Sequence, residues 1–284
     1  MPELPEVETV RIGLDQVTTN KNIKGGEVLL ERSIAYPFSV EEFLTGITGT
    51  QLQQWQRRGK YLLGRLVNEQ QQPQGWLGVH LRMTGQLLWV DRAEPIHKHT
   101  RVRLSFGNQK ELRFVDQRTF GKVWWVPPNL EITEIISGLK LMGVEPLSAD
   151  FTPEHLATKL QPCRRVIKTA LLDQTIVAGI GNIYADEALF LSGINPQVRG
   201  MDLTFAEISK LHQAIVQVLE TSIKHGGTTF SNFLNVQGTN GNYGGVANVY
   251  NRSGSPCKVC QTPIMRVKLG GRSSHFCPQC QKPQ

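Results

Sequence analysis

Apolar residues recur at helical spacing close to the start of the chain. Val7, Val10, Leu14 and Val17 fall on one face of a helix with 3.6 residues per turn. The pattern predicts one amphipathic helix that anchors the N-terminus on a hydrophobic core. Such an anchor matters because an unanchored chain terminus frays.

From about Lys24 to Pro128 the pattern changes to short β-rich runs, most of them separated by turn-forming residues. Repeated short strands of this kind are typical of an antiparallel sandwich. We therefore expect a β domain behind a single N-terminal helix. The expected strands are 27–30, 51–55, 61–67, 76–81, 86–90, 102–106, 111–114 and 122–126.

Helical signals dominate the second half of the chain. Thr152-Pro153 predicts the start of a helix that runs to Leu160, because Thr caps helices well and Pro suits their first turn. Further helices are expected over 164–172, 182–191 and 204–224, with a short one after Gly226-Gly227. This order predicts an α+β fold. The expected divisions are a β-sandwich domain at 1–130, a linker at 131–150, a helical domain at 151–236 and a C-terminal segment at 237–284.

Positive charge is concentrated at the C-terminal end of this 284-residue chain of formal net charge +7. From Thr221 onward there is no Asp or Glu, and seven Lys and Arg residues stand there. A basic face of this kind suits a phosphate backbone, although a solvated surface is the alternative. No apolar run approaches the length of a membrane span, and no signal region opens the chain, which predicts a soluble, cytoplasmic protein.

Four of the five cysteines form two Cys-x-x-Cys pairs separated by 16 residues. This spacing predicts a zinc ribbon in which one structural Zn²⁺ is held by four thiolates. A closed four-sulfur shell leaves no position for a catalytic water, so the metal should fold the tail and take no part in chemistry. Cys163 stands apart as an ordinary thiol. The predicted ligands are Cys257, Cys260, Cys277 and Cys280.

The first six residues, Met1-Pro2-Glu3-Leu4-Pro5-Glu6, carry candidate chemistry. Once Met1 is removed, Pro2 presents a secondary amine, which is nucleophilic near neutral pH because α-amines have a pKa of about 8. Attack on a sugar C1′ or on an aldehyde carbon gives an iminium that drives elimination, and Glu3 can donate a proton to a leaving sugar oxygen. The alternative is that Pro2 and Pro5 only fix the backbone ahead of a helix.

Gly179-Ile180-Gly181-Asn182 places two glycines directly before a predicted helix. Backbone N–H groups at such a helix start can hold a phosphate. The stretch lacks the third glycine and the preceding strand of a dinucleotide-binding loop, so we expect no nucleotide cofactor.

Two turn motifs in the β domain could serve base extrusion. Residues 80–85 place Met83 at a turn, and residues 116–121 do the same for Arg118 and Phe120. Each is consistent with an ordinary core or turn position. An enzyme that extrudes a base must fill the vacated space, however, and apolar side chains with an arginine suit that task. The pattern also predicts that Lys60 is a flexible cation at a strand edge and could take part in function. The alternative is that this lysine only protects the exposed edge of the sheet from pairing with another chain.

Residues 2–9 resemble the start of the formamidopyrimidine-DNA glycosylase family, and the Gly-Asn-Ile-Tyr stretch and the zinc ribbon extend the resemblance to Lys282. It implies a bifunctional glycosylase and abasic-site lyase for oxidised purines, with a helix-two-turn-helix domain. Pro2 would be the nucleophile, Glu3 would assist ring opening and Glu6 would support them. Lys60 and Arg272, the latter at a predicted hairpin tip, would assist the eliminations.

The same resemblance implies that the chain binds lesion-bearing duplex DNA. We expect a monomer, because nothing in the sequence suggests a self-complementary patch. Met83, Arg118 and Phe120 would form the wedge. The implied phosphate contacts are His99, Arg164, Lys168 and Asn182.

The resemblance weakens over 237–251, where family members commonly have Tyr-Gly-Arg and this chain has Tyr250-Asn251-Arg252. In the family this loop covers the extruded base. Two other interpretations therefore stand beside the first: a sister glycosylase for oxidised pyrimidines, and a non-catalytic zinc-ribbon protein that binds nucleic acid. Leu4 and the three wedge residues favour the purine enzyme.

Overall fold

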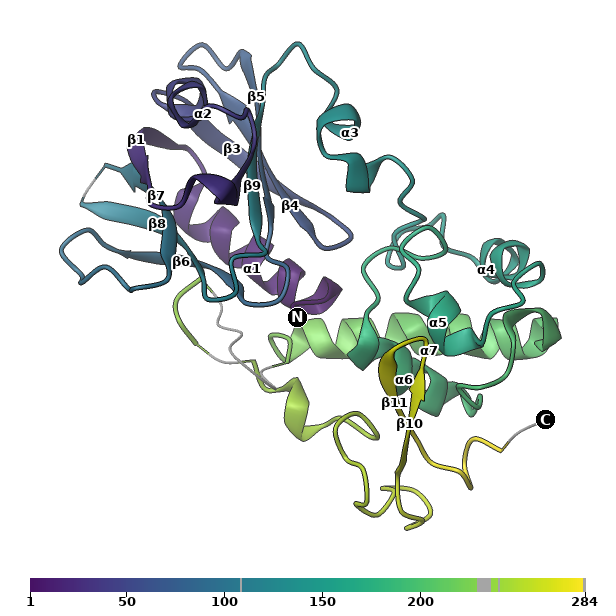
Figure 1. The fold of residues 1–284 in the computed structure, drawn as a ribbon. Helices are drawn as coiled ribbons and strands as arrows, with labels where there is room; N and C mark the ends of the chain where they lie inside the picture. Colours follow the sequence, from purple (N-terminus) through teal and green to yellow (C-terminus); the bar gives the residue numbers. More distant parts are fainter. Residues whose placement is uncertain (108, 229–235, 240, 283–284) are drawn as a thin grey trace. The chain divides into compact units, whose positions relative to one another are not determined.

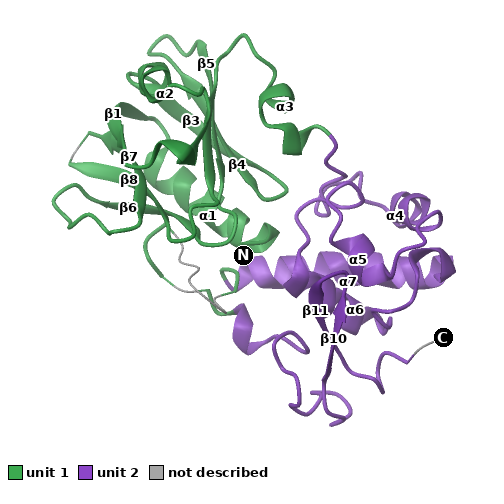
Figure 2. Ribbon diagram, viewed as in Figure 1, with its two compact units in different colours: residues 1–140, 226–242 green, residues 141–225, 243–284 purple. Residues whose placement is uncertain are grey.

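The computed structural model describes residues 1–107, 109–228, 236–239 and 241–282. These residues form two compact units, the first from 1–140 with 226–242 and the second from 141–225 with 243–284 (Figure 2). Residues 226–242 group with the first unit, since Val236 is buried in its core and its carbonyl accepts from the Trp89 N–H at 2.9 Å. The boundaries expected from the sequence placed residues up to 236 with the helices, and those boundaries stay a prediction.

The predicted N-terminal helix is confirmed as α1 (Leu4–Thr18). Pro5 lies in its first turn, where a missing N–H costs nothing. Leu4, Val7, Val10 and Leu14 are fully buried, and the last three join the core of the β-sheet domain. Figure 1 shows the helix beside the strands of this unit. Burial of this face fixes the first turn of α1, and with it the residues just before the helix.

The strands form the sandwich that the sequence predicted, with one corner strand joining its two halves. The order is β2-β9-β5-β4-β3-β1-β7-β8-β6, antiparallel except for β2 and β9. Strand β1 pairs with β3 through Lys21 and Asn22, and then with β7 over the rest of its length. The strands are β1 (Lys21–Val28), β2 (Ile34–Tyr36), β3 (Gln51–Arg58), β4 (Tyr61–Val67), β5 (Pro73–His80), β6 (Gly85–Asp91), β7 (Thr100–Phe106), β8 (Lys110–Asp116) and β9 (Lys122–Val126).

The expectation of a single helix in this unit was wrong. Helix α2 (Val40–Ile47) follows the N-cap Ser39, whose Oγ accepts from the Glu42 N–H at 3.2 Å. Phe43 and Ile47, four residues apart, are fully buried against the sheet. A Ser followed three residues later by Glu is a helix-start signal that the sequence did offer. A short helix α3 (Ile132–Ile135) closes the unit.

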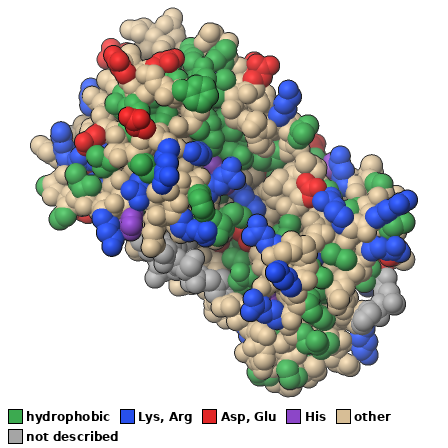
Figure 3. Space-filling model, viewed as in Figure 1, with side chains coloured by type: hydrophobic (Ala, Val, Ile, Leu, Met, Phe, Trp, Pro, Cys, Tyr) green, Lys and Arg blue, Asp and Glu red, His purple; other side chains and the backbone are tan. Residues whose placement is uncertain are grey.

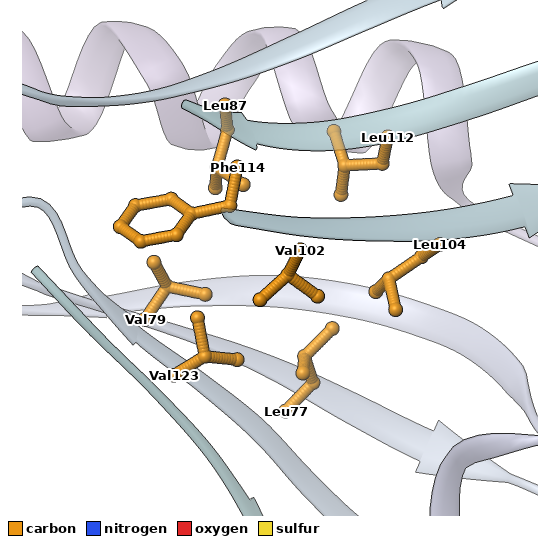
Figure 4. A pocket seen from close by; sticks show the side chains of 8 residues that line it. All are labelled: Leu77, Val79, Leu87, Val102, Leu104, Leu112, Phe114 and Val123. Atoms are coloured by element: carbon orange, nitrogen blue, oxygen red, sulfur yellow. The ribbon is translucent and has the colours of Figure 1, made fainter. Parts of the chain in front are cut away.

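The interior between the sheet halves is apolar and nearly filled. Figure 4 shows eight aliphatic and aromatic side chains around a space of about 10 Å³, including Leu77, Val102 and Phe114. That is room for one water at most, and the lining offers it no polar partner. The space is therefore a packing feature of the core.

The second unit is helical and ends in a β-hairpin. The predicted cap Thr152 is confirmed, and Thr204 caps the helix that follows it in the same way; each hydroxyl accepts from the N–H three residues on. The predicted helix over 164–172 is shorter than expected, and the short helix expected after Gly227 falls on 229–235, outside the described residues. The elements are α4 (Pro153–Leu160), α5 (Ile167–Leu171), α6 (Asn182–Ser192), α7 (Phe205–Lys224), β10 (Met265–Leu269) and β11 (Arg272–Phe276). No helix of the described residues is long and apolar enough to span a bilayer.

Candidate active site and nucleic-acid interface

The residues before α1 are held by a buried carboxylate. Pro2 is buried, and the side chains of Glu3 and Glu6 are 2% and 1% exposed. Glu6 Oε2 accepts from the Glu3 N–H at 2.8 Å, and Glu6 Oε1 accepts from the Thr228 N–H at 2.7 Å. The negative charge also lies at the positive end of the α1 dipole. Glu6 therefore ties the N-terminal turn to the returning segment 226–228.

Gly227 makes this contact possible. Its φ of +77° lies in the left-handed region, which side chains of L-residues adopt rarely. A Cβ at this position would lie 3.0 Å from Glu6 Oε1 and 3.2 Å from Glu6 Cα. The backbone at 227 can approach α1 this closely only because it carries no side chain.

Lys60 is not the flexible edge cation that the sequence predicted. It lies in the two-residue turn between β3 and β4 and is 7% exposed. Its charge contributes to the electrostatics of His80, a buried residue at the end of β5. Burial first, and then the charges of Arg82 and Lys60, lower the pKa of His80 to about 3.

His80 was not among the expected site residues, although it opens the stretch that contains Met83. Its ring lies edge-on to Tyr61 at 4.5 Å between centroids, and its Nδ1 accepts from the Arg82 N–H at 3.0 Å. A neutral imidazole with Nδ1 as acceptor carries its proton on Nε2. The low pKa comes from burial beside two cations, and neither the burial nor the nearby charges can be read from the sequence motif.

The two wedge motifs meet at one end of the strand pair β6–β8. Gly85 pairs with Asp116 in the ladder, so the turn that carries Met83 and the loop that carries Arg118 are neighbours. Asp116 joins them: its carboxylate accepts from the Thr84 hydroxyl and, at 2.7 Å, from the Gly121 N–H.

The side chains of the second motif project from this support. Phe120 is 52% exposed, and the Arg118 guanidinium lies 5.0 Å from the centre of its ring. An exposed aromatic ring and a cation stacked on a fixed loop have the chemistry that a wedge needs, and the wedge role of these residues stays a prediction. Met83 is partly buried in the adjacent turn.

His99 is held beside the same loop by Arg101. The Arg101 Nη2 lies 3.1 Å from His99 Nδ1, and Arg101 Nε donates to the Asp116 carbonyl at 2.8 Å. Desolvation, followed by the charges of Lys98 and Arg101, lowers the pKa of His99. With Nδ1 accepting from Arg101, the proton of the neutral ring is on Nε2, which can donate to a phosphate oxygen.

In the second unit, Asn182 begins α6 directly after Gly181. Its side-chain Oδ1 is buried and has no hydrogen-bond partner among the described residues. The Oδ1 atom of this carboxamide therefore holds no other part of the fold in place. It lies at a helix start, where backbone N–H groups favour the binding of anions. Arg164 is exposed in the loop before α5, not inside a helix as expected.

Lys168 corrects another expectation. Its side chain is 0% exposed, and its Nζ lies 2.6 Å from Asp186 Oδ1 and 2.7 Å from the Asn182 carbonyl. An ammonium buried in an ion pair does not face a phosphate. The sequence could not show this because Lys168 and Asp186 meet only through the packing of α5 on α6.

The four predicted zinc ligands come together. Their sulfurs all lie within 4.8 Å of one another, and three of the sulfur pairs are separated by 3.4, 3.5 and 3.9 Å. A tetrahedral zinc with Zn–S bonds of about 2.3 Å requires sulfurs about 3.8 Å apart, so the cluster fits the metal. The N–H groups of Val259 and Cys280 each donate to a cysteine sulfur at 3.4 Å, as suits thiolates.

The ribbon has little other means of support. Burial, and then the neighbouring sulfurs, raise the pKa of the Cys280 thiol, so four thiolates require a cation among them. The apolar cluster beside them is small and consists of Phe190, Val249, Ile264 and two of the cysteines. These four cysteines form a structural zinc site.

Arg272 stands at the hairpin tip, as predicted. Gly270 and Gly271 form the turn with φ of +53° and +79°, and Arg272 is the first residue of β11. Its side chain is exposed and has no hydrogen-bond partner among the described residues. On the face drawn in Figure 3, lysine and arginine side chains are spread over both units, as a polyanion-binding protein requires.

Three family models match successive parts of the chain. They describe a formamidopyrimidine-DNA glycosylase N-terminal domain at 1–123, a formamidopyrimidine-DNA glycosylase H2TH domain at 142–233, and a zinc finger found in FPG and IleRS at 254–283. Together they cover most of the sheet of the first unit, the helices α4 to α7 and the ribbon.

Curated relatives and solved structures agree with these models. The formamidopyrimidine-DNA glycosylase of Nostoc punctiforme is 65% identical over 281 residues, covering 99% of this chain and 96% of the relative. That of Synechocystis is 56% identical over 282 residues, covering 99% and 98%. An FPG mutant of Lactococcus lactis, bound to Fapy-dG containing DNA, is 33% identical with a TM-score of 0.90, covering 99% and 100%. The chain therefore belongs to the formamidopyrimidine-DNA glycosylase family.

Proposed function

We propose that this glycosylase removes oxidised purines from double-stranded DNA through the amine of Pro2 and then cleaves the strand at the abasic site, acting as a cytoplasmic monomer. The observation that carries the proposal is the N-terminal turn: Pro2 and Glu3 are buried, and the Glu6 carboxylate fixes them to segment 226–228. Glu3 and Glu6 form a capping box at the start of α1, and the second Glu6 oxygen adds the bond to the Thr228 N–H, so the residue beside Pro2 is held from two sides.

The first step joins the protein to the sugar. The Pro2 nitrogen attacks C1′, and the bond between C1′ and the base breaks with its electron pair going to the base. The ring bond between C1′ and O4′ then opens as the iminium forms. The base and O4′ each need a proton; the amine supplies one and the Glu3 carboxyl, in its neutral form, supplies the other.

The iminium then drives two eliminations. A base, either the Glu3 carboxylate left by the first step or water, takes a C2′ proton. The electrons of that bond move toward the iminium and then break the C3′–O bond, so that the phosphate leaves with the electron pair. Loss of the C4′ proton in the resulting conjugated iminium breaks the C5′–O bond in the same sense. Lys60 and Arg272 supply positive charge to the departing phosphates, and Arg272 does so as a permanent cation.

Recognition in this proposal is divided among the groups already described. The Met83 turn and the loop with Arg118 and Phe120 fill the space of the extruded base, while His99 Nε2, Asn182 and Arg164 contact phosphates. Lys168 contributes indirectly, since its ammonium is paired with Asp186.

The lesion class rests on the relatives. Solved complexes of Lactococcus lactis Fpg contain Fapy-dG DNA in some cases and an oxidised pyrimidine in another. A preference for purines is therefore a matter of relative rates, to be measured with both lesion types on the same enzyme.

Borohydride trapping tests the proposal. A duplex with a single 8-oxoguanine is incubated with the enzyme, and reduction converts an iminium into a stable protein–DNA band. The band should form with the lesion, fail with a plain G·C duplex and be lost in Pro2→Gly. Trapping only with an oxidised pyrimidine would assign the sister activity, and no trap with any lesion or abasic site would leave a nucleic-acid-binding protein.

A further inference from the structure

Asp186, near the start of α6, is the centre of a buried polar network in the second unit. It is 1% exposed, and four nitrogen or hydroxyl groups surround its two carboxylate oxygens. Oδ1 accepts from Lys168 Nζ at 2.6 Å and from Ser274 Oγ at 2.8 Å. Oδ2 accepts from the His275 N–H at 2.9 Å and lies 3.0 Å from His275 Nδ1.

Three of these four contacts reach strand β11. Arg272 opens this strand, two residues before Ser274, and Leu269 and Arg272 close the ladder next to the glycine turn. The tip also touches α5: a Cβ on Gly270 would lie 2.7 Å from Thr169 Cγ2. The strand that carries Arg272 is therefore fixed on α6 by Asp186 and packed on α5 beside Thr169.

We propose that Asp186 is a positioning residue for Arg272 in the second elimination, in which the C4′ proton is lost and the C5′–O bond breaks. The inference rests on the proposed role of Arg272 and deepens it. Asp186 does not itself touch DNA. It fixes the position of the hairpin tip on α5 and α6. The exposed side chain of Arg272 is thereby held where it contacts one particular phosphate.

The chemistry of the network explains why a carboxylate is needed. Four donors converge on two oxygens, and one of them is a buried ammonium. An amide in the same place could accept on one side only, and its NH₂ group would oppose either Lys168 or the N–H of His275. Glu187, the next residue, is equally buried but holds a different segment, accepting from the N–H groups of Asn248, Val249 and Tyr250.

The test uses the full-length, zinc-loaded enzyme on a duplex with a preformed abasic site, so that base recognition plays no part. Gel analysis separates the product of the first elimination from that of the second. Arg272→Ala serves as the reference and should lose the second product while keeping the first. Asp186→Asn should lower the ratio of second to first product by about tenfold to a hundredfold, the effect of a misplacement near 1 Å.

Two further variants keep the test decisive if Asp186→Asn folds poorly. Ser274→Ala removes one contact and leaves the ion pair intact, and it should lower the ratio by a smaller factor. Glu187→Gln, the matched control, should reduce thermal stability without changing the ratio. Zinc content and circular dichroism are measured for each variant.

The outcomes are distinguishable. If Arg272→Ala loses the second product while Asp186→Asn and Ser274→Ala keep the wild-type ratio, the positioning inference is wrong and the proposed role of Arg272 stands. If Arg272→Ala keeps the second product, both are wrong. An additive loss in the double variant Asp186→Asn/Arg272→Ala would also contradict the inference, because a residue acting through Arg272 has no effect once Arg272 is gone.

Discussion

The two units hold their reactive groups by different physical means. In the first, a large apolar core fixes α1, and a single carboxylate, Glu6, completes the N-terminal turn. In the second, the hairpin with Arg272 has only a small apolar cluster and depends on zinc and the buried network at Asp186. The N-terminal turn should therefore tolerate loss of the metal, whereas the hairpin should not.

Zinc removal should produce the largest difference between the units. A structural zinc can supply on the order of 10 kcal/mol of folding free energy in small domains. Chelation should unfold the ribbon at 254–282 while the sheet of the first unit keeps its circular dichroism. Hydrogen exchange resolved by peptide would show this, and equal loss of protection in both units would contradict it.

Breaking the buried ion pair should rank next. Lys168→Met removes the buried ammonium that is paired with the Asp186 carboxylate and should cost about 3–5 kcal/mol in chemical denaturation. The control is Arg165→Met, which removes the exposed Arg165–Asp173 pair at 2.8 Å and should cost about 0–1 kcal/mol. Similar losses for both variants would mean that the burial of the pair has no energetic weight.

In the first unit, the low pKa of His80 predicts that stability falls as the solution becomes more acidic. Its pKa is about 3 in the folded state and about 6.5 when unfolded, so the unfolded state binds the extra proton between these values. Stability should then fall as the pH drops, by about 2 kcal/mol between pH 7 and pH 5 from this residue. Denaturation of His80→Gln at both pH values should show a loss smaller by that amount, and an equal loss would refute the assignment.

Gly227→Ala should have the smallest effect on stability, yet it acts at the nucleophile. The strained φ alone should cost about 1 kcal/mol, and the added Cβ presses on Glu6. Gly49 is the matched control, because its φ is +81° and a Cβ there would meet no atom of the described residues within 4 Å. The Ala variants at both positions should lose similar stability, while only Gly227→Ala should slow borohydride trapping. Equal trapping rates for the two would show that the contact with Glu6 does not matter for attack.

Features that depend only on residues close together in the sequence were predictable. The zinc ligands follow from spacing, α1 from its apolar period, α4 from its Thr-Pro start, and the hairpin tip from its glycines. Helix α2 also had its signal, in Ser39 and Glu42, but lay inside a region of β pattern. Features that depend on which elements meet were not predictable. The burial of Lys60, the neutral state of His80 and the pairing of Lys168 with Asp186 all arise from tertiary packing.

Peptide mapping of the trapped complex would show most directly whether Pro2 forms the covalent bond to the sugar. The reduced protein–DNA complex is digested with protease and nuclease, and the sugar remnant is located by mass spectrometry. We expect the adduct on the nitrogen of Pro2, in a chain from which Met1 has been removed. An adduct on Lys60, or a trapped chain that still carries Met1, would rule out the Pro2 amine as the nucleophile.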